Sequence, residues 1–192
     1  AKYFGMEIFG IRQGYSGLIN DDMVEMEMRS VSDIVQRGGT MLRTARCVEM
    51  YTVEGQKQAV KTLNNRGIEG LVVIGGDGSF RGAKCLSEEY GIPTIGIPGT
   101  IDNDLEYTDY TLGFDTSVNT CLDIINKLRD TMTSHERISV VEVMGRRCGD
   151  IALNVGVAAG AIATLVPEVP FDFEKDVIGR IRMAQKTGKR HY

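Results

Sequence analysis

The sequence lacks the features that would indicate several common classes of protein. Its four cysteines are far apart and form no CxxC pair, so the sequence does not predict a zinc site. No apolar run approaches the length of a membrane-spanning helix, and no membrane partner is expected. Acidic residues outnumber lysine and arginine by 26 to 22, so no overall positive charge favours nucleic acid as a partner. This balance still allows a locally basic pocket for an anionic substrate.

The composition that is present is typical of a globular protein. The chain has 192 residues, of which 42% are hydrophobic and 25% charged, enough for one large domain or two small lobes. Cys85, Cys121 and Cys148 fall in helical patterns and are expected to be buried free thiols, which suits the reducing cytoplasm. The first residues resemble the tail of a helix that runs into a strand, and the last residues stop as if another strand followed. We therefore expect an incomplete part of a longer chain.

Short apolar runs alternate with helical patterns along the chain. Residues 71–74 (LVVI) contain no polar side chain, which is typical of a strand covered on both faces. The order strand, helix, strand predicts a parallel sheet with helices on both faces. A lobe boundary is expected near Gly113. The expected strands are residues 6–11, 24–28, 71–74, 94–97, 138–144 and 164–166, and the expected helices are residues 56–66, 79–90, 115–129, 150–161 and 174–187.

The first candidate site is the GGDGS loop, residues 75–79, which follows the 71–74 strand. Its glycines allow a sharp turn and a close approach to a ligand, and its amides lie at a helix N-terminus, which attracts phosphate. Asp77 beside a phosphate would be repelled unless a cation such as Mg²⁺ lay between them. No GK[ST] sequence follows, so the loop is not a Walker A motif. The alternative is a βα turn with a capping aspartate.

The second candidate site is GTIDND, residues 99–104, which follows the next expected strand. Asp102 and Asp104 are two residues apart, so in an extended loop both would point the same way. Two neighbouring carboxylates can divide roles, one as a base and the other as an orienting group. Thr100 can donate a hydrogen bond from its hydroxyl. The alternative is a turn rich in aspartate and asparagine.

Loop arginines supply positive charge near these carboxylates. Arg146 follows Gly145 at the end of the 138–144 strand and can hold a phosphate with two parallel hydrogen bonds. Arg147, Arg46 and Arg137 are open to the same use or to a plain surface position. A phosphate loop, a metal carboxylate, a base and several arginines are together the parts of phosphoryl transfer from a nucleotide to a hydroxyl of a phosphorylated acceptor.

Three long motifs, GGDGS, PGTIDND followed by YTLGFDTS, and ISVVEVMGRRCGD, resemble the 6-phosphofructokinase family of the ATP-dependent, bacterial type. The resemblance covers about residues 5–191 and corresponds to the central part of the family's sequence. It implies a Rossmann-like three-layer α/β/α fold with mainly parallel sheets in two lobes, both incomplete. Residues 1–113 would be part of the large ATP-binding lobe and residues 114–192 part of the smaller sugar-phosphate-binding lobe. The family's first strand, with its GGDxPG loop, and the second half of its sugar site are not among these residues.

The resemblance implies transfer of the γ-phosphate of ATP to the 1-hydroxyl of fructose 6-phosphate, a step of glycolysis, with Mg²⁺ as cofactor. Asp102 is expected to be the general base, with Thr100 and Arg146 as further catalytic residues, and Asp77 is expected to hold the metal. The remaining expected contacts are Arg46, Cys47, Gly76, Asp77, Gly78 and Ser79 for ATP, and Thr100, Ile101, Asp102, Arg137, Met144, Gly145 and Arg146 for the sugar phosphate.

Regulation and assembly also follow from the resemblance. Arg137 resembles an arginine that reaches the substrate phosphate of a neighbouring subunit, which implies a homotetramer with shared sites. Ile162 stands where allosteric bacterial members usually have Glu, a departure that weighs against Mg²⁺-linked effector binding. The residues that resemble the family's site for an anionic effector are Arg129, Lys186, Lys189 and Arg190.

Two glycines bear on the phosphoryl donor. Pyrophosphate-dependent relatives typically have Asp at the position of Gly78 and Lys at that of Gly99. An Asp at position 78 would crowd the nucleotide, which is larger than pyrophosphate, and a Lys at position 99 would compensate for a missing nucleotide. With glycine at both positions, the chain resembles the ATP-dependent type. A pyrophosphate-dependent enzyme is the nearest alternative. Kinases of NAD or diacylglycerol share only the GGDG pattern. For these residues alone, the alternative is an inactive fragment that only packs into an oligomer.

Overall fold

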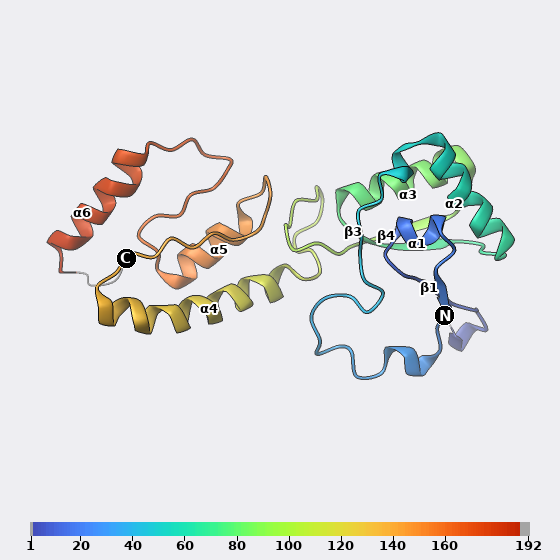
Figure 1. The fold of residues 1–192 in the computed structure, drawn as a ribbon, viewed down its shortest axis with the longest axis horizontal. Helices are drawn as coiled ribbons and strands as arrows, with labels where there is room; N and C mark the ends of the chain where they lie inside the picture. The colour runs from blue at the N-terminus through green and yellow to red at the C-terminus, as the bar shows by residue number, and fades with distance from the viewer. Residues whose placement is uncertain (1, 189–192) are drawn as a thin grey trace. The chain divides into compact units, whose positions relative to one another are not determined.

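The computed structural model describes residues 2–188. Their contacts divide the chain into two compact units, Ala1–Ile97 and Pro98–Tyr192, whose α-helices and most of whose strands are labelled in Figure 1. The lobe boundary expected at Gly113 falls inside the second unit. The assignment of residues 1–113 and 114–192 to two functional lobes stays a prediction, because chain contacts alone do not assign a ligand to either part.

The first unit alternates short strands and helices. Helix α2 begins after Thr52, whose hydroxyl oxygen accepts a hydrogen bond from the Gly55 amide at 3.1 Å, as N-capping residues do. Ala59 and Leu63, four residues apart on α2, are fully buried, which confirms the expected apolar stripe. The elements are η1 (Lys2–Phe4), β1 (Phe9–Ile11), α1 (Tyr15–Ile19), β2 (Met23–Glu25), η2 (Met28–Val31), η3 (Glu49–Tyr51), α2 (Val53–Asn65), β3 (Leu71–Gly75), α3 (Asp77–Tyr90) and β4 (Thr94–Pro98), where these η elements are 3-10 helices.

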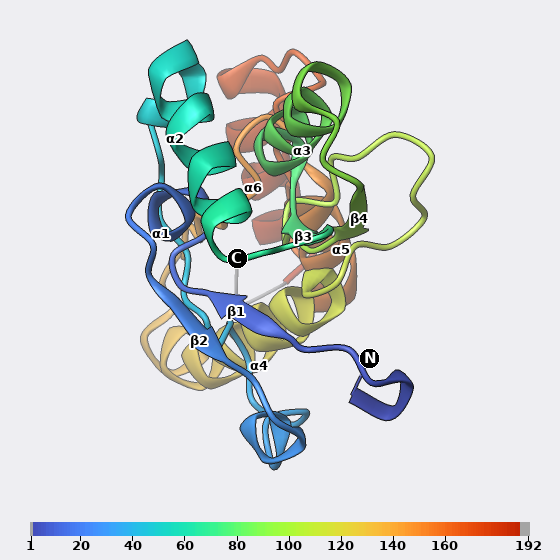
Figure 2. The same ribbon diagram turned by 90° about the vertical axis from the view of Figure 1, so that its right-hand side faces the viewer.

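Two small sheets lie in this part of the chain. Strands β1 and β2 pair antiparallel, with Gly10 opposite Val24, and form a separate ribbon in Figure 2. Strands β3 and β4 pair in a second, parallel sheet. The α/β fold class is therefore confirmed.

Helix α3 packs against the β3–β4 sheet on one face. Phe80 of α3 lies so close to Gly96 of β4 that a Cβ there would come within 2.9 Å of the ring. Val72 and Ile74 alternate to the other face and are 63% and 65% exposed, so the described residues do not cover β3 on both faces as its apolar sequence predicts. The core of the unit consists of Leu18, Met50, Ala59, Leu63, Leu71, Leu86 and Ile92.

The second unit is mainly helical in its described part. Helices α4 and α5 pack side by side (Figure 1) and bury Phe114, Ile151 and Val155 between them and the preceding loop. Its elements are α4 (Phe114–His135), α5 (Asp150–Ala159), the π-helical segment η4 (Phe173–Ile178) and α6 (Gly179–Lys186).

Several sequence expectations need correction here. Residues 138–144 and 164–166 are not strands, because a strand needs a hydrogen-bonded neighbour and neither segment has one among the described residues. The expected helix over 174–187 opens as the π-helical segment η4 and is α-helical only from Gly179 to Lys186.

The cysteines are free, as expected, but each is only half-buried. Cys85 and Cys121 lie on helices, whereas Cys148 lies in the turn before α5. No helix in the described part of the chain combines the length and apolar character needed to cross a membrane.

Candidate active site

The GGDGS loop joins β3 to α3 in the first unit. A Cβ on Gly75 would come within 2.5 Å of the Ser79 hydroxyl, so the first turn of α3 folds back over the strand end and requires glycine there. Gly76 is the extended N-cap residue, and Asp77 is the first residue of the helix. The loop therefore presents the amides of a helix N-terminus, as the sequence predicts.

Tyr15 of α1 contacts the end of this loop at Ser79, and the sequence did not reveal this contact. Its hydroxyl donates a hydrogen bond to the Ser79 carbonyl oxygen at 2.6 Å. A Cβ on Gly82 would come within 2.6 Å of the Tyr15 ring, so glycine at this position lets helix and ring meet. Burial and, to a smaller extent, the nearby Cys85 raise the pKa of Tyr15 to about 12. The phenol therefore keeps the proton that it donates in the hydrogen bond to Ser79. A tyrosine beside a turn carries no sequence signal for such a long-range contact.

Asp77 is half-exposed and pairs with Arg81 one turn along α3, with 2.9 Å between carboxylate and guanidinium. Among the described residues no cluster of three or more His, Cys, Asp or Glu side chains could hold a metal ion alone. A single carboxylate does fit Mg²⁺, which commonly binds one or two carboxylates together with substrate phosphates. Arg81 would then share or release the carboxylate.

Gly78 differs from the other loop glycines. Its φ is not positive, and a Cβ there would meet no protein atom within 4 Å. Neither backbone conformation nor packing within the chain therefore requires glycine at this helical position.

Arg46 and Cys47 lie on the same unit but outside regular structure. Arg46 is exposed, and the Cys47 thiol donates to a Glu49 carboxylate oxygen at 3.5 Å. Burial is the first cause that raises the pKa of Cys47, which lowers the fraction of this thiol in the reactive thiolate form. No described hydrogen bond joins either residue to the GGDGS loop.

The GTIDND loop opens the second unit. Ile101 packs against the cluster of Phe114, Ile151 and Val155, and the Asp102 amide donates to the Thr100 hydroxyl at 3.2 Å. Asn103 has a φ of +55°, so the backbone bends between Asp102 and Asp104. The expectation that Asp102 and Asp104 point the same way assumed an extended loop, and the left-handed Asn103 shows that the loop is not extended.

The arginine turn lies between residue 144 and α5. Gly145 has a φ of +143°, and a Cβ on it would come within 2.4 Å of the Cys148 carbonyl oxygen. Arg146 is also left-handed, with a φ of +57°, which is uncommon for a residue with a side chain. The Gly149 amide donates to Glu168 at 2.7 Å and holds the end of the turn. Met144 and Arg146 are exposed at its start.

The pKa of Asp102 in the GTIDND loop responds to a charge in the arginine turn. The pKa of Asp102 is raised, first by burial and then by the charge of Asp104, while Arg146 acts in the opposite direction. The guanidinium of Arg146 is thus close enough to act on Asp102. A carboxyl with a raised pKa beside a cation is the arrangement expected for proton transfer next to an anionic group.

The remaining basic residues are dispersed. Arg129 of α4 donates a hydrogen bond to the Ala159 carbonyl oxygen, the last residue of α5, and so caps that helix. Arg137 and Lys186 are exposed. Lys189 and Arg190 lie outside the described residues.

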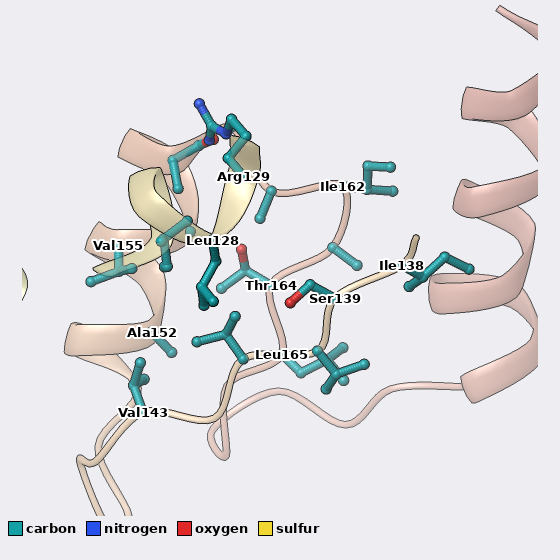
Figure 3. Close-up of a pocket in the computed structure, with 18 of the residues that line it drawn as sticks. Leu128, Arg129, Ile138, Ser139, Val143, Ala152, Val155, Ile162, Thr164 and Leu165 are labelled. Carbon is teal, nitrogen blue, oxygen red and sulfur yellow. The ribbon is translucent and has the colours of Figure 1, made fainter. Parts of the chain in front are cut away.

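An apolar cavity of about 290 Å³ lies beside Arg129 (Figure 3). Its wall includes Leu128, Val155 and Leu165, and it contains none of residues 100–102 or 144–146. It therefore offers little to a phosphate and is distinct from the GTIDND loop and the arginine turn.

Three sequence comparisons agree with one another. The sequence model of the family described as "Phosphofructokinase" matches residues 1–192. The chain is 59% identical over 189 residues to an ATP-dependent 6-phosphofructokinase of Paenibacillus macquariensis, covering 98% of this chain and 58% of that protein. It is 61% identical over 187 residues to that of Clostridium botulinum strain Hall, covering 97% and 58%.

Solved structures give the same grouping. Phosphofructokinase from Saccharomyces cerevisiae superposes with a TM-score of 0.87 at 32% identity, over 99% of this chain and 29% of that chain. A pyrophosphate-dependent phosphofructokinase from Marinobacter aquaeolei shares the fold, with a TM-score of 0.78 at 22% identity over 96% and 50% of the two chains.

The protein is thus of the α/β class, with carboxylates after two neighbouring strands and an arginine turn before a helix. It belongs to the phosphofructokinase family. The chain spans about 58% of the length of the curated relatives that it matches.

Proposed function

We propose that the protein containing this chain transfers the γ-phosphate of Mg²⁺-bound ATP to the 1-hydroxyl of fructose 6-phosphate. The observation that carries the proposal is the Asp102 carboxyl, half-buried, with a raised pKa and with Arg146 acting on it. A base with a pKa above that of an ordinary aspartate is better matched to accepting a proton from a sugar hydroxyl. Arg146 supplies the charge for the phosphate that such an acceptor carries.

Gly78 supports ATP as the donor. A glycine that alanine could replace without strain costs about 0.4–1 kcal/mol of stability, and nothing in the chain requires one at Gly78, the second residue of α3. Close approach of a ligand to the backbone accounts for it. Ser79 and Gly76 offer the amides beside it, and Asp77 would hold Mg²⁺, which neutralises charge on the transferred phosphate when bound.

Other parts of the proposal rest on the family alone. ATP-binding roles for Arg46 and Cys47, sugar-phosphate contacts from Met144 and Gly145, and a homotetramer in which Arg137 reaches a neighbouring site belong here. So do cytoplasmic location and an effector site that includes Lys186. For Arg129 the cap on α5 is a competing role, since its guanidinium already has a partner.

The test is a steady-state assay of the intact protein with fructose 6-phosphate and either ATP or pyrophosphate. We expect turnover with ATP and Mg²⁺ and none with pyrophosphate. Asp102→Asn should lower kcat by about 10²–10⁴-fold with little change in KM. Asp104→Asn is the matched control, because it removes a neighbouring carboxylate of the same loop and should retain most of kcat. Turnover with pyrophosphate alone, or a normal kcat for Asp102→Asn, would contradict the proposal.

A further inference from the structure

Asn103 lies between the two aspartates of the GTIDND loop and is held from two sides. Its side-chain nitrogen donates to the Asp150 carboxylate at 2.8 Å, and its side-chain oxygen accepts from the Thr111 amide at 3.0 Å. Asp150 is the first residue of α5. The amide therefore connects the loop to the start of α5 on one side and to the segment before α4 on the other.

The two partners fix which way the amide faces. Turning it over would place its oxygen against a carboxylate and its nitrogen against an N–H donor, and both contacts would be repulsive. The left-handed φ of +55° at Asn103 is also a conformation that asparagine tolerates better than most residues. Asparagine thus meets a backbone and a side-chain requirement at once.

Thr111 completes the arrangement. It is only 4% exposed, and its hydroxyl donates to the Thr100 carbonyl oxygen at 2.5 Å. Thr111 therefore holds the loop at Thr100 through its side chain and at Asn103 through its backbone. Asp102 lies between these two fixed points.

We propose that Asn103, Thr111 and Asp150, here named the Asn103 clamp, position the Asp102 carboxylate for proton transfer. The inference rests on the proposed role of Asp102 as the base. The clamp residues are positioning residues, since each acts through the backbone of the loop. The charged groups that act on Asp102 are Asp104 from its own loop and Arg146 from the arginine turn.

Two matched pairs of variants of the intact protein test the clamp. Thr111→Val keeps the shape of the side chain and loses the hydroxyl, whereas Thr111→Ser keeps the hydroxyl. Asp150→Ala loses the oxygen that accepts the hydrogen bond from Asn103, whereas Asp150→Asn keeps an acceptor oxygen. Both variants lose the negative charge of Asp150. The second pair decides the matter if Thr111→Val does not fold, because Asp150 is only half-buried.

We expect Thr111→Val and Asp150→Ala to lower kcat by about 10–100-fold, the effect of a misplaced catalytic group, with KM for both substrates little changed. Thr111→Ser and Asp150→Asn should restore most of kcat. The acidic limb of the pH profile of kcat/KM should move to lower pH in the two damaging variants, because a released Asp102 is better solvated. A role in stability alone would not move this limb.

Equal kcat within each pair, or an acidic limb that stays in place, would overturn the clamp. Asp102→Asn measured alongside separates the two proposals. If Asp102→Asn is inactive while Thr111→Val and Asp150→Ala are normal, the clamp alone is wrong. If Asp102→Asn keeps its activity, the proposed function is wrong and the clamp is refuted with it.

Discussion

Two glycines of helix α3 should respond in opposite ways to the same substitution. Gly78→Ala adds a methyl group where no protein atom lies within 4 Å, whereas Gly82→Ala adds one within 2.6 Å of the Tyr15 ring. Gly78 is the second residue of α3 and Gly82 the sixth, and neither has a positive φ. Alanine can adopt both backbone conformations, so the lower entropy of the unfolded chain favours alanine at both positions by about 0.4–1 kcal/mol.

At Gly82 the steric term is larger than this gain. Overpacking costs about 1–3 kcal/mol, and the Tyr15 ring can move away only by releasing its hydrogen bond to Ser79, a loss of about 1 kcal/mol. We expect Gly82→Ala to lower the free energy of unfolding by about 1–3 kcal/mol. At Gly78 nothing opposes the entropy term, so Gly78→Ala should raise the free energy of unfolding by about 0.5 kcal/mol.

Urea-induced unfolding of the intact protein, followed by circular dichroism, measures both values, and the ATP dependence of turnover gives the functional effect. If a nucleotide approaches the backbone at Gly78, the methyl group introduced by Gly78→Ala should raise KM for ATP by about tenfold, equivalent to about 1.4 kcal/mol. The reasoning is refuted if Gly78→Ala is destabilised as much as Gly82→Ala. A stabilised Gly78→Ala with unchanged KM would remove the nucleotide from this position.

Two further predictions concern titrating groups. Tyr15→Phe should lower stability at neutral pH by about 1 kcal/mol. The pKa of Tyr15 rises from 10.0 to about 12 on folding. The free energy of unfolding of the parent protein should therefore fall, relative to that of Tyr15→Phe, as the pH rises from 10 towards 12. Urea titrations at several pH values measure both free energies, and parallel pH dependences of the two proteins would contradict this prediction. For Asp102, Asp104→Asn should lower the pKa and Arg146→Met should raise it. The acidic limb of kcat/KM should accordingly move to lower pH in the first and to higher pH in the second, and shifts of the same sign would refute the assignment.

Local patterns predicted most of the helices and the β3–β4 pair. The LVVI run and the glycines after it give β3 and the start of α3, and the 3.6-residue stripe gives α2, because these signals depend on neighbours in sequence. Residues 138–144 have the same apolar character, yet no described strand pairs with them. A strand depends on a partner that the local pattern does not contain.

The candidate loops were found from sequence, but their supports were not. Asp77 and Asp102 stand out because glycine and carboxylate follow apolar runs. Tyr15 and Thr111 carry no such pattern, and their contacts with Ser79 and Thr100 depend on the fold. The alternation rule also failed at Asn103, because it assumes extended backbone and the φ of +55° bends the loop.

One structural element of the second unit, the start of α5, supports both the GTIDND loop and the arginine turn. Asp150 opens α5 and holds Asn103, while Gly149, just before it, donates its amide to Glu168 and ends the turn that carries Arg146. The start of α5 therefore holds both the loop that carries Asp102 and the turn that carries Arg146. Ile151 and Val155 fasten that helix in the apolar core together with Phe114, and Ile101 packs on the same cluster. We expect the packing of this apolar cluster to influence how strongly Arg146 acts on Asp102, although only Ile101 among these four residues belongs to the GTIDND loop.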